Sequence, residues 1–188
     1  MEFIDLLVQR RSVRDFLETG VPLETIREII REACMAPSSG NGQPWKYVIV
    51  NNRERIKKLS DESKGNFLAM LAQNPDSPLK KYEAALGNPD FNVFYNAPAL
   101  VYIGCSKGVK SAQVDCALAA SYFMFSAAAM NLGTCWIALG ADIRDSALRK
   151  TMAMDDDYQI IAPIILGYPK AVPATPVRNE PQILKVVS

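Results

Sequence analysis

A group of arginines near the amino end is the first set of residues whose spacing suggests chemistry. Arg10, Arg11 and Arg14 lie within five residues of one another, with Ser12 between them. The planar guanidinium group binds phosphate oxygens through two parallel hydrogen bonds, and a serine hydroxyl adds a neutral donor. The segment therefore predicts a site for a phosphorylated ligand. The alternative is that these arginines follow a short helix, where they complement its dipole and stay solvated.

A loop framed by prolines, residues 37–44, carries the second set. Its glycines allow the backbone to approach a ligand closely, and its amide side chains each offer a donor and an acceptor. Such a mixture suits the edge of a planar heterocycle with alternating C=O and N–H groups, such as a flavin. The alternative is a stiff helix-to-strand connection whose side chains bond their own backbone. The candidate ligand-binding residues here are Pro37, Ser38, Ser39, Asn41 and Gln43.

Other patterns carry weaker signals. Residues 40–45 begin like the dinucleotide-binding GxGxxG pattern, but a tryptophan occupies the third glycine position. The acidic run 155–157 favours a solvated turn over a cation site, because consecutive residues do not share one face of a helix or strand. Taken alone, Trp136 is expected to be a core residue rather than a ligand contact. Arg178 is either a surface residue or a distant third anchor for a phosphate.

The missing residue types exclude several classes of enzyme. The 188 residues include no histidine, which excludes Ser-His-Asp hydrolases and His-ligated zinc sites. The four cysteines form no CxxC pair and are too sparse for a disulfide scaffold, so we expect buried free thiols in a reducing cytoplasm. A net charge of +1 provides no basic field for nucleic acid. The length is that of one domain.

Neither end of the sequence nor its most apolar stretch predicts a membrane association. Residues 2–5 are acidic where a signal peptide would be basic, so we expect none. Residues 117–132 are apolar but shorter than the roughly 20 residues that cross a bilayer. This stretch is apolar on nearly every face, so we expect a helix that is surrounded by protein.

Short strands alternating with longer helices predict an α/β or α+β protein built around one sheet. The polar stretch 74–92 is expected to be a mobile loop or lid, and Pro163 suggests a bulge or an edge position in the last strand. Helices are expected at 2–9, 22–36, 51–59, 63–73, 111–132 and 142–152, and strands at 46–50, 99–103, 134–137 and 158–166.

The last residues form a separate segment. Residues 169–188 contain four prolines and cannot be helical through their middle, yet they end in an apolar run. We therefore divide the chain into a body, residues 1–168, and an extended arm, residues 169–188. The apolar tip must pack on something, either the body or a second copy of the chain.

Taken together, these motifs resemble the nitroreductase family of FMN-dependent flavoproteins. Residues 10–16, RRSVRDF, are similar to the family's RRSxRxF opening, and residues 36–45 to its A-P-S-x-x-N-x-Q-P-W loop. Both motifs are specific. Residues 95–98 (YNAP), 131–136 (NLGTCW) and 166–169 (LGYP) keep the family's order and spacing but are individually weaker.

The resemblance implies an α+β fold with a central mixed sheet flanked by helices. It also implies a homodimer with exchanged C-terminal arms and two FMN sites at its interface, the loop residues reaching the flavin from the partner subunit. It assigns the phosphate and ribityl chain to the arginine segment, the N5/O4 edge to the strand near residue 136, and the pyrimidine edge to a helix. The residues so implied, beyond those of the loop, are Arg10, Arg11, Ser12, Arg14, Asn66, Cys135, Trp136, Ile137, Ala138 and Arg178.

The resemblance also implies an oxidoreductase with a ping-pong mechanism. NADH or NADPH would deliver hydride to flavin N5 and leave, and a small-molecule acceptor such as a nitroaromatic or a quinone would then take the electrons. No side chain is expected to act as catalytic acid or base. Dehalogenation or flavin fragmentation by the same fold, or flavin binding without turnover, remain the alternatives.

Overall fold

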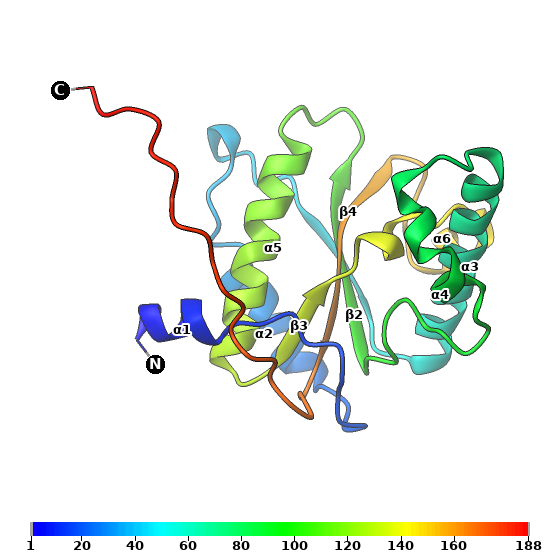
Figure 1. Ribbon diagram of the computed structural model, residues 1–188, viewed down its shortest axis with the longest axis horizontal. Coiled ribbons are helices and arrows are strands. Elements are labelled where there is room, and N and C mark those ends of the chain that lie inside the picture. Colours follow the sequence, from blue (N-terminus) through cyan, green and yellow to red (C-terminus); the bar gives the residue numbers. More distant parts are fainter. Residues whose placement is uncertain (1, 188) are drawn as a thin grey trace.

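The computed structural model describes residues 2–187, which form three layers. A four-stranded sheet lies between two groups of helices (Figure 1). The strand order is β1-β2-β4-β3, and each neighbouring pair is antiparallel. The strands are β1 (Lys46–Val50), β2 (Ala99–Ser106), β3 (Gly133–Trp136) and β4 (Tyr158–Gly167).

This architecture confirms the expected α+β class. The sheet is mixed only in a limited sense, because its four strands are all antiparallel to their neighbours. In the described part of the chain, parallel pairing occurs at an isolated bridge between Ser12 and Thr134, which adds the arginine segment to the outer edge of β3.

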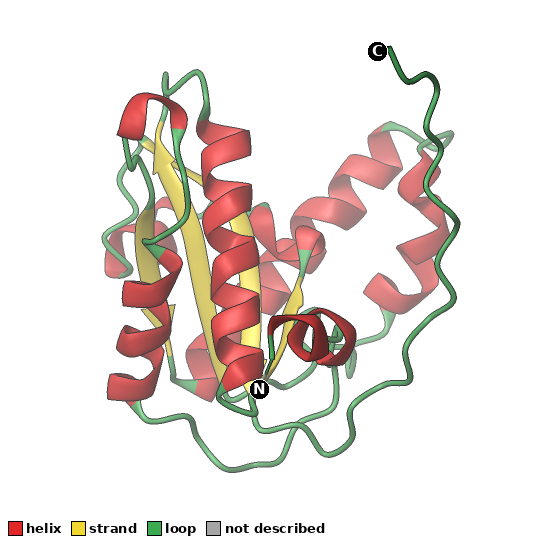
Figure 2. Ribbon diagram, turned by 90° about the vertical axis from the view of Figure 1, so that its left-hand side faces the viewer, coloured by secondary structure: helices red, strands yellow, loops and turns green. Residues whose placement is uncertain are grey.

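Helices cover both faces of the sheet (Figures 1 and 2). On one face α2 (Leu23–Ala33) packs against α5 (Ala112–Ala129), and α1 (Phe3–Gln9) lies beside α5. On the other face lie α3 (Arg53–Gln73), α4 (Glu83–Gly87) and α6 (Ser146–Thr151). The short helical turns are η1 (Ser39–Asn41), η2 (Pro78–Tyr82) and η3 (Ala138–Ala141).

Helix α3 is one continuous element, so the prediction of two helices separated near residue 60 is wrong. Asn52 caps its start by accepting a hydrogen bond from the Arg55 amide at 2.9 Å, as expected for this cap. Three polar residues in the middle of this helix do not face solvent. Ser60, Ser63 and Lys64 are buried in the structure, and their side chains bond backbone groups of other segments.

Two further expectations on this side of the sheet are corrected. Residues 74–92 contain the turn η2 and the helix α4, so they are more ordered than a plain loop. The helix expected from Asp142 begins instead at Ser146, where the Asp145 side chain accepts from the Leu148 amide at 2.7 Å. The turn η3 occupies the preceding residues.

The strand β4 contains a bulge close to Pro163, while Pro163 itself pairs in register with Tyr102. Ile103 pairs with Ala162 and Gly104 with Ile160, which leaves one extra residue in β4. The alternative prediction, that Pro163 lies in an edge strand, is wrong, because β4 lies between β2 and β3. The carbonyl of Pro163 accepts from Ile137 just past the end of β3, at 2.8 Å. Since the N and C=O of a strand residue point to the same side, the missing N–H of Pro163 faces the point where β3 has ended.

The C-terminal segment leaves the body of the protein. After the bridge between Phe16 and Pro169, no helix or strand follows in the described residues. Figure 1 shows the segment passing α5 and ending away from the body. Ile183 and Leu184 are 75% and 96% exposed, so the apolar tip is not packed on its own body. Among the described residues, no helix is both long and apolar enough to span a membrane.

A buried lysine ties α3 to the segment before β2. Lys64 is 8% exposed, and its ammonium group donates to the carbonyls of Asn88 at 2.7 Å and Phe91 at 2.8 Å, with Pro89 at 3.4 Å. These carbonyls belong to a turn without regular backbone pairing. The turn itself is largely exposed, so the buried ammonium group of Lys64 donates its hydrogen bonds to the inner side of a surface turn.

We expect Lys64→Met to lower the free energy of unfolding by about 2–4 kcal/mol, because the carbonyls lose a charged donor while methionine preserves most of the packing. Urea unfolding followed by far-ultraviolet circular dichroism would measure the change. Lys58→Met, at an exposed position of the same helix, is the matched control and should change the value by less than about 0.5 kcal/mol. Equal losses in the two variants would contradict this role of Lys64.

Candidate functional site

The arginine segment is attached to β3 by its backbone. Val13 donates to the carbonyl of Thr134 at 2.9 Å, next to the bridge between Ser12 and Thr134. The approach is close because Gly133 has no side chain. A Cβ atom at Gly133 would lie 2.7–2.8 Å from Cβ and both methyl groups of Val13. Residues 10–14 are thus held at a fixed place along the sheet edge.

Three guanidinium groups gather beside this edge. Burial lowers the pKa of Arg10, and the charges of Arg11 and then Arg178 lower it further. Arg178, more than 160 positions along the chain, therefore lies near the amino-terminal arginines. Arg11 is only 8% exposed, and its side chain donates to Thr175 Oγ1 at 3.2 Å. None of the ion pairs among the described residues involves these arginines.

A second part of the cluster surrounds Cys135. Burial raises the pKa of the Cys135 thiol, while Arg14, the hydroxyl of Ser12 and Arg10 act in the opposite direction. These four side chains are therefore neighbours. The guanidinium carbon of Arg14 lies 5.7 Å from the centre of the Tyr95 ring, a distance typical of a cation–π interaction.

A cavity of about 440 Å³ opens beside the arginines. It lies between the ends of α1 and α5, the start of β3 and the first part of the C-terminal segment. Arg10, Arg11 and Thr134 contribute to its lining, whereas Arg14 and residues 135–138 lie outside it. Thr134 is 1% exposed, and its Oγ1 has no hydrogen-bond partner among the described residues. The cavity thus has two arginines in its lining and a buried, unpaired hydroxyl group in its wall.

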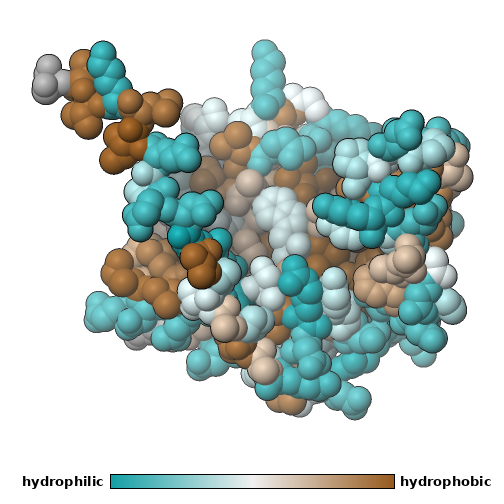
Figure 3. Space-filling model, viewed as in Figure 1, coloured by the Kyte–Doolittle hydropathy of each residue, from teal (hydrophilic) through white to brown (hydrophobic). Residues whose placement is uncertain are grey.

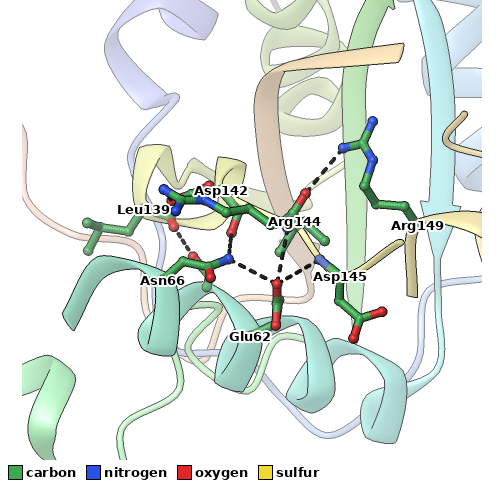
Figure 4. Close-up of polar contacts among 9 residues, drawn as sticks. Glu62, Asn66, Leu139, Asp142, Arg144, Asp145 and Arg149 are labelled. Carbon is green, nitrogen blue, oxygen red and sulfur yellow. Dashed lines mark hydrogen bonds and ion pairs between the residues drawn. The ribbon is translucent and has the colours of Figure 1, made fainter. Parts of the chain in front are cut away.

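The end of β3 leads into the turn η3. Ile137 is buried and donates its N–H to Pro163, so this amide is not free for a ligand. Trp136 is half-buried and Ala138 is exposed. Asn66, on the neighbouring helix α3, donates to the carbonyl of Asp142 at 2.9 Å (Figure 4). Asn66 therefore lies against the segment that follows η3.

The proline-framed loop has an unusual backbone. Gly40, Asn41 and Gln43 have φ angles of 57°, 55° and 43°, in the left-handed region that most residues avoid. Side chains hold this shape: Ser38 Oγ accepts from the Gln43 amide, and Gln43 Nε2 donates to Asn41 Oδ1, both at 3.0 Å. The loop thus uses part of its polar capacity internally, as the alternative interpretation holds, while Asn41 and Gln43 stay exposed.

The loop and the arginines are not brought together within one chain. The amide of Ser39 donates to Asp115 at 3.0 Å, in the first turn of α5. Arg10 instead lies 5.9 Å from the ring of Phe125, near the other end of that helix. Ten positions along an α-helix correspond to about 15 Å. The two sets of candidate residues therefore occupy opposite ends of α5.

The sequence profile of the nitroreductase family matches residues 7–168. The chain belongs to the nitroreductase family. It is 26% identical over 175 residues to a protein of Archaeoglobus fulgidus provisionally named NADH dehydrogenase/NAD(P)H nitroreductase, covering 90% of this chain and 86% of the relative. It is also 36% identical over 84 residues to human iodotyrosine deiodinase 1, covering 43% of this chain and 29% of the deiodinase.

The fold has close counterparts among solved structures. A nitroreductase with bound FMN from Bacteroides fragilis superimposes with a TM-score of 0.85 over all of both chains, at 22% identity. This similarity shows that the fold is that of the nitroreductases. The family resemblance of the sequence motifs is thereby confirmed.

Two residues beside the arginine segment, Tyr95 and Thr134, carry no signal of their own in the sequence. Tyr95 is half-buried against Arg14 and, like Asn96, has a positive φ of 52°. The motif that contains Tyr95 carried a signal only through its order in the chain. Thr134 was treated as an ordinary strand residue, and its unpaired hydroxyl depends on a packing arrangement that no local pattern encodes.

We expect Gly133→Ala to lower the free energy of unfolding by about 1–3 kcal/mol, because the new methyl group would overlap Val13 and push the arginine segment from β3. Gly65→Ala is the matched control. This glycine lies inside α3 with nothing within 4 Å of a Cβ, so the substitution should raise stability by about 0.5–1 kcal/mol. Urea unfolding checks both values, and a Gly133→Ala protein as stable as the native chain would disprove the close contact.

Proposed function

We propose that this nitroreductase-family chain is an FMN-dependent oxidoreductase that takes electrons from NADH or NADPH and passes them to a small-molecule acceptor, such as a nitroaromatic or a quinone. The observation that carries the proposal is the cluster of Arg10, Arg11 and Arg178. Arg10 and Arg11 line the cavity and Arg178 lies near Arg10, and no carboxylate is paired to the three among the described residues. Such a cluster suits a dianionic phosphate.

The residues of the cluster fit the phosphorylated end of FMN. Phosphate oxygens would accept from the guanidinium groups, and the free Oγ1 of Thr134 could take up a further hydrogen bond. The FMN-bound structure of the Bacteroides fragilis nitroreductase, which shares the fold, supports this choice of ligand. The proposed holding residues are Arg10, Arg11, Ser12, Arg14 and Arg178 for the phosphate and ribityl chain, Cys135, Trp136, Ile137 and Ala138 near the N5/O4 edge, and Asn66 near the pyrimidine edge.

FMN, when bound, would accept a hydride at N5 and pass electrons on from the same pocket. The chain's own residues would bind and orient it. Arg14, held against Tyr95, would contribute positive charge that favours the reduced, more negative state of the ligand. No side chain of the site is proposed as a catalytic acid or base, so protons would come from solvent or substrate.

We further propose that the site is completed by a second copy of the chain. Helix α5 buries one face but leaves Val114 and Tyr122 63% and 42% exposed, so it is not surrounded by protein as its sequence predicts. Figure 3 shows further apolar side chains over α1 and at the tip of the C-terminal segment. Two α5 helices packed antiparallel about a two-fold axis would place the loop of one chain at the arginines of the other.

In this dimer Pro37, Ser38, Ser39, Asn41 and Gln43 would reach the flavin of the partner subunit. The extended arm, residues 169–188, would pack its apolar tip on the partner in exchange. The four cysteines, all free thiols, are compatible with a reducing compartment such as the cytoplasm.

A second candidate reaction is reductive dehalogenation of a tyrosine derivative. The 36% identity to iodotyrosine deiodinase 1 over 84 residues favours it. The chain spans 29% of that relative, however, so the deiodinase reaction is the weaker proposal. Turnover of 3-iodotyrosine with negligible reduction of nitroaromatics would favour dehalogenation over the first proposal.

The visible absorption spectrum of freshly purified protein tests the cofactor. We expect a yellow protein that bleaches on addition of NADH or NADPH under nitrogen. Arg14→Ala should weaken FMN binding by about 1.5–3 kcal/mol, roughly 10- to 150-fold in Kd, because a charge-assisted hydrogen bond is lost. Arg27→Ala, at an exposed arginine of α2, is the control. A native protein that is colourless and takes up no added FMN would refute the proposal.

Mixing two variants with weakened FMN binding, assayed at an FMN concentration that saturates only intact sites, tests the shared site. Arg14→Ala damages the arginine half and Asn41→Ala the loop half. After unfolding and refolding together in equal amounts, about half of the dimers should be mixed, each with one intact site, which restores about a quarter of the native activity. Each variant refolded alone should stay at its own low activity. No gain on mixing would mean that both halves act within one chain.

A further inference from the structure

One carboxylate on α3 collects the hydrogen bonds of the segment that follows β3. Glu62 Oε1 accepts from the backbone amides of Arg144 at 3.1 Å and Asp145 at 2.9 Å, and from Asn66 Nδ2 at 3.0 Å (Figure 4). The two amides lie 82 and 83 positions away in the chain. Arg144 itself pairs with Asp142, so Glu62 bonds N–H groups of the backbone rather than a cationic side chain.

The segment held in this way has few backbone hydrogen bonds of its own. Between residues 138 and 145, the described backbone contacts outside regular elements are Gly140 to Ile137 at 2.9 Å, Ile143 to Ala141 at 3.1 Å and Arg149 to the Asp145 carbonyl at 2.9 Å. The Arg149 side chain also donates to the Ile143 carbonyl at 3.3 Å. Helix α3 supplies the other anchors on this side. Ser63 donates to the carbonyl of Leu139, and Asn66 to that of Asp142. The conformation of this segment therefore depends on side chains of α3.

The anchored segment is continuous with the end of β3. One residue, Ala138, separates the Leu139 carbonyl from Ile137, which is itself fixed to Pro163. These are the residues that the proposed function places at the reacting edge of the flavin. A change in how α3 holds residues 139–145 would therefore alter the geometry at that edge, although Glu62 need not touch the ligand.

Glu62 also determines how Asn66 presents its amide group. Nδ2 of Asn66 donates to both Glu62 and Asp142, so its two hydrogens are committed. Only Oδ1, an acceptor, is then available to a ligand. An acceptor at this position matches the N3–H of a flavin pyrimidine ring and excludes a carbonyl.

We propose that Glu62 is a positioning residue of the flavin site: it fixes the segment 139–145 and the amide orientation of Asn66, and through them the edge of the flavin. The inference rests on the proposed function. One oxygen atom of Glu62, Oε1, accepts all three hydrogen bonds. A glutamine at this position keeps that oxygen and loses only the charge, whereas an alanine removes the acceptor.

Two measurements on Glu62→Ala, Glu62→Gln and the native protein test the proposal. Hydrogen exchange of the peptide covering residues 139–145 reports how firmly Glu62 holds this segment (the clamp), and it needs no flavin. FMN titration reports the dissociation constant and, at saturation, the visible spectrum of the bound flavin. Glu54→Gln, at an exposed carboxylate of the same helix, is the control variant.

We expect Glu62→Ala to speed exchange in this peptide at least about tenfold, to raise the Kd for FMN about tenfold, and to shift the spectrum of the bound flavin. Glu62→Gln should restore all three readouts to within about threefold of native, and Glu54→Gln should match the native protein. Faster exchange with a native Kd and a native spectrum at saturation would reduce Glu62 to a structural residue and overturn the proposal. Unchanged exchange in Glu62→Ala would overturn it as well.

Failure of the proposed function has a different signature. If the native protein bound no FMN, the titrations of all variants would be flat while the exchange data still showed whether the clamp exists. That outcome would remove the flavin role of Glu62 together with the function itself.

Discussion

Uncompensated positive charge at the edge of the sheet is the constraint on which the rest of this structure depends. The lowered pKa of Arg10 expresses it directly, since burial and the charges of Arg11 and Arg178 all disfavour its charged form. Like charges at short range oppose folding, and here no carboxylate of the described chain relieves them. A bound phosphate would remove this repulsion, so the cluster stabilises the ligand-bound state more than the free one.

The protein tolerates the cluster because separate features fix each part of it. Strand-like pairing with Thr134 holds the backbone of the arginine segment, and the missing side chain of Gly133 allows that pairing. The Tyr95 ring lies against Arg14, and Thr175 accepts from Arg11. None of these partners is an anion. The guanidinium groups are therefore held in place by contacts that leave their charge available.

How much of the fold and of the candidate site the sequence predicts depends on how far apart in the chain the interacting residues lie. Arg10 to Arg14 and the loop from Pro37 to Gln43 can be proposed as ligand-binding segments from the sequence because their chemistry is local: residue types at short spacing. The continuity of α3 could not be predicted. Its polar residues look solvent-facing in sequence, but Ser63 bonds a carbonyl 76 positions away and Glu62 bonds amides more than 80 positions away. Tyr95 and Thr134 acquire their roles in the same way, from packing that a local pattern does not contain.

The same distinction explains why folding of one chain leaves the proposed site incomplete. Strand pairing fixes the arginine segment, and side chains of α3 fix the segment that follows β3. The third set of candidate residues, the proline-framed loop 37–44, is fixed by Asp115 at the far end of α5. Within a chain, the length of α5 keeps this third set about 15 Å from the first. No rearrangement of side chains spans that distance, and moving the loop would break its contact with Asp115. In the proposed dimer, antiparallel packing of a second α5 would bridge it without any such change. The open face of α5 and the free arm then follow from the same requirement, because both would be buried only in the assembled dimer.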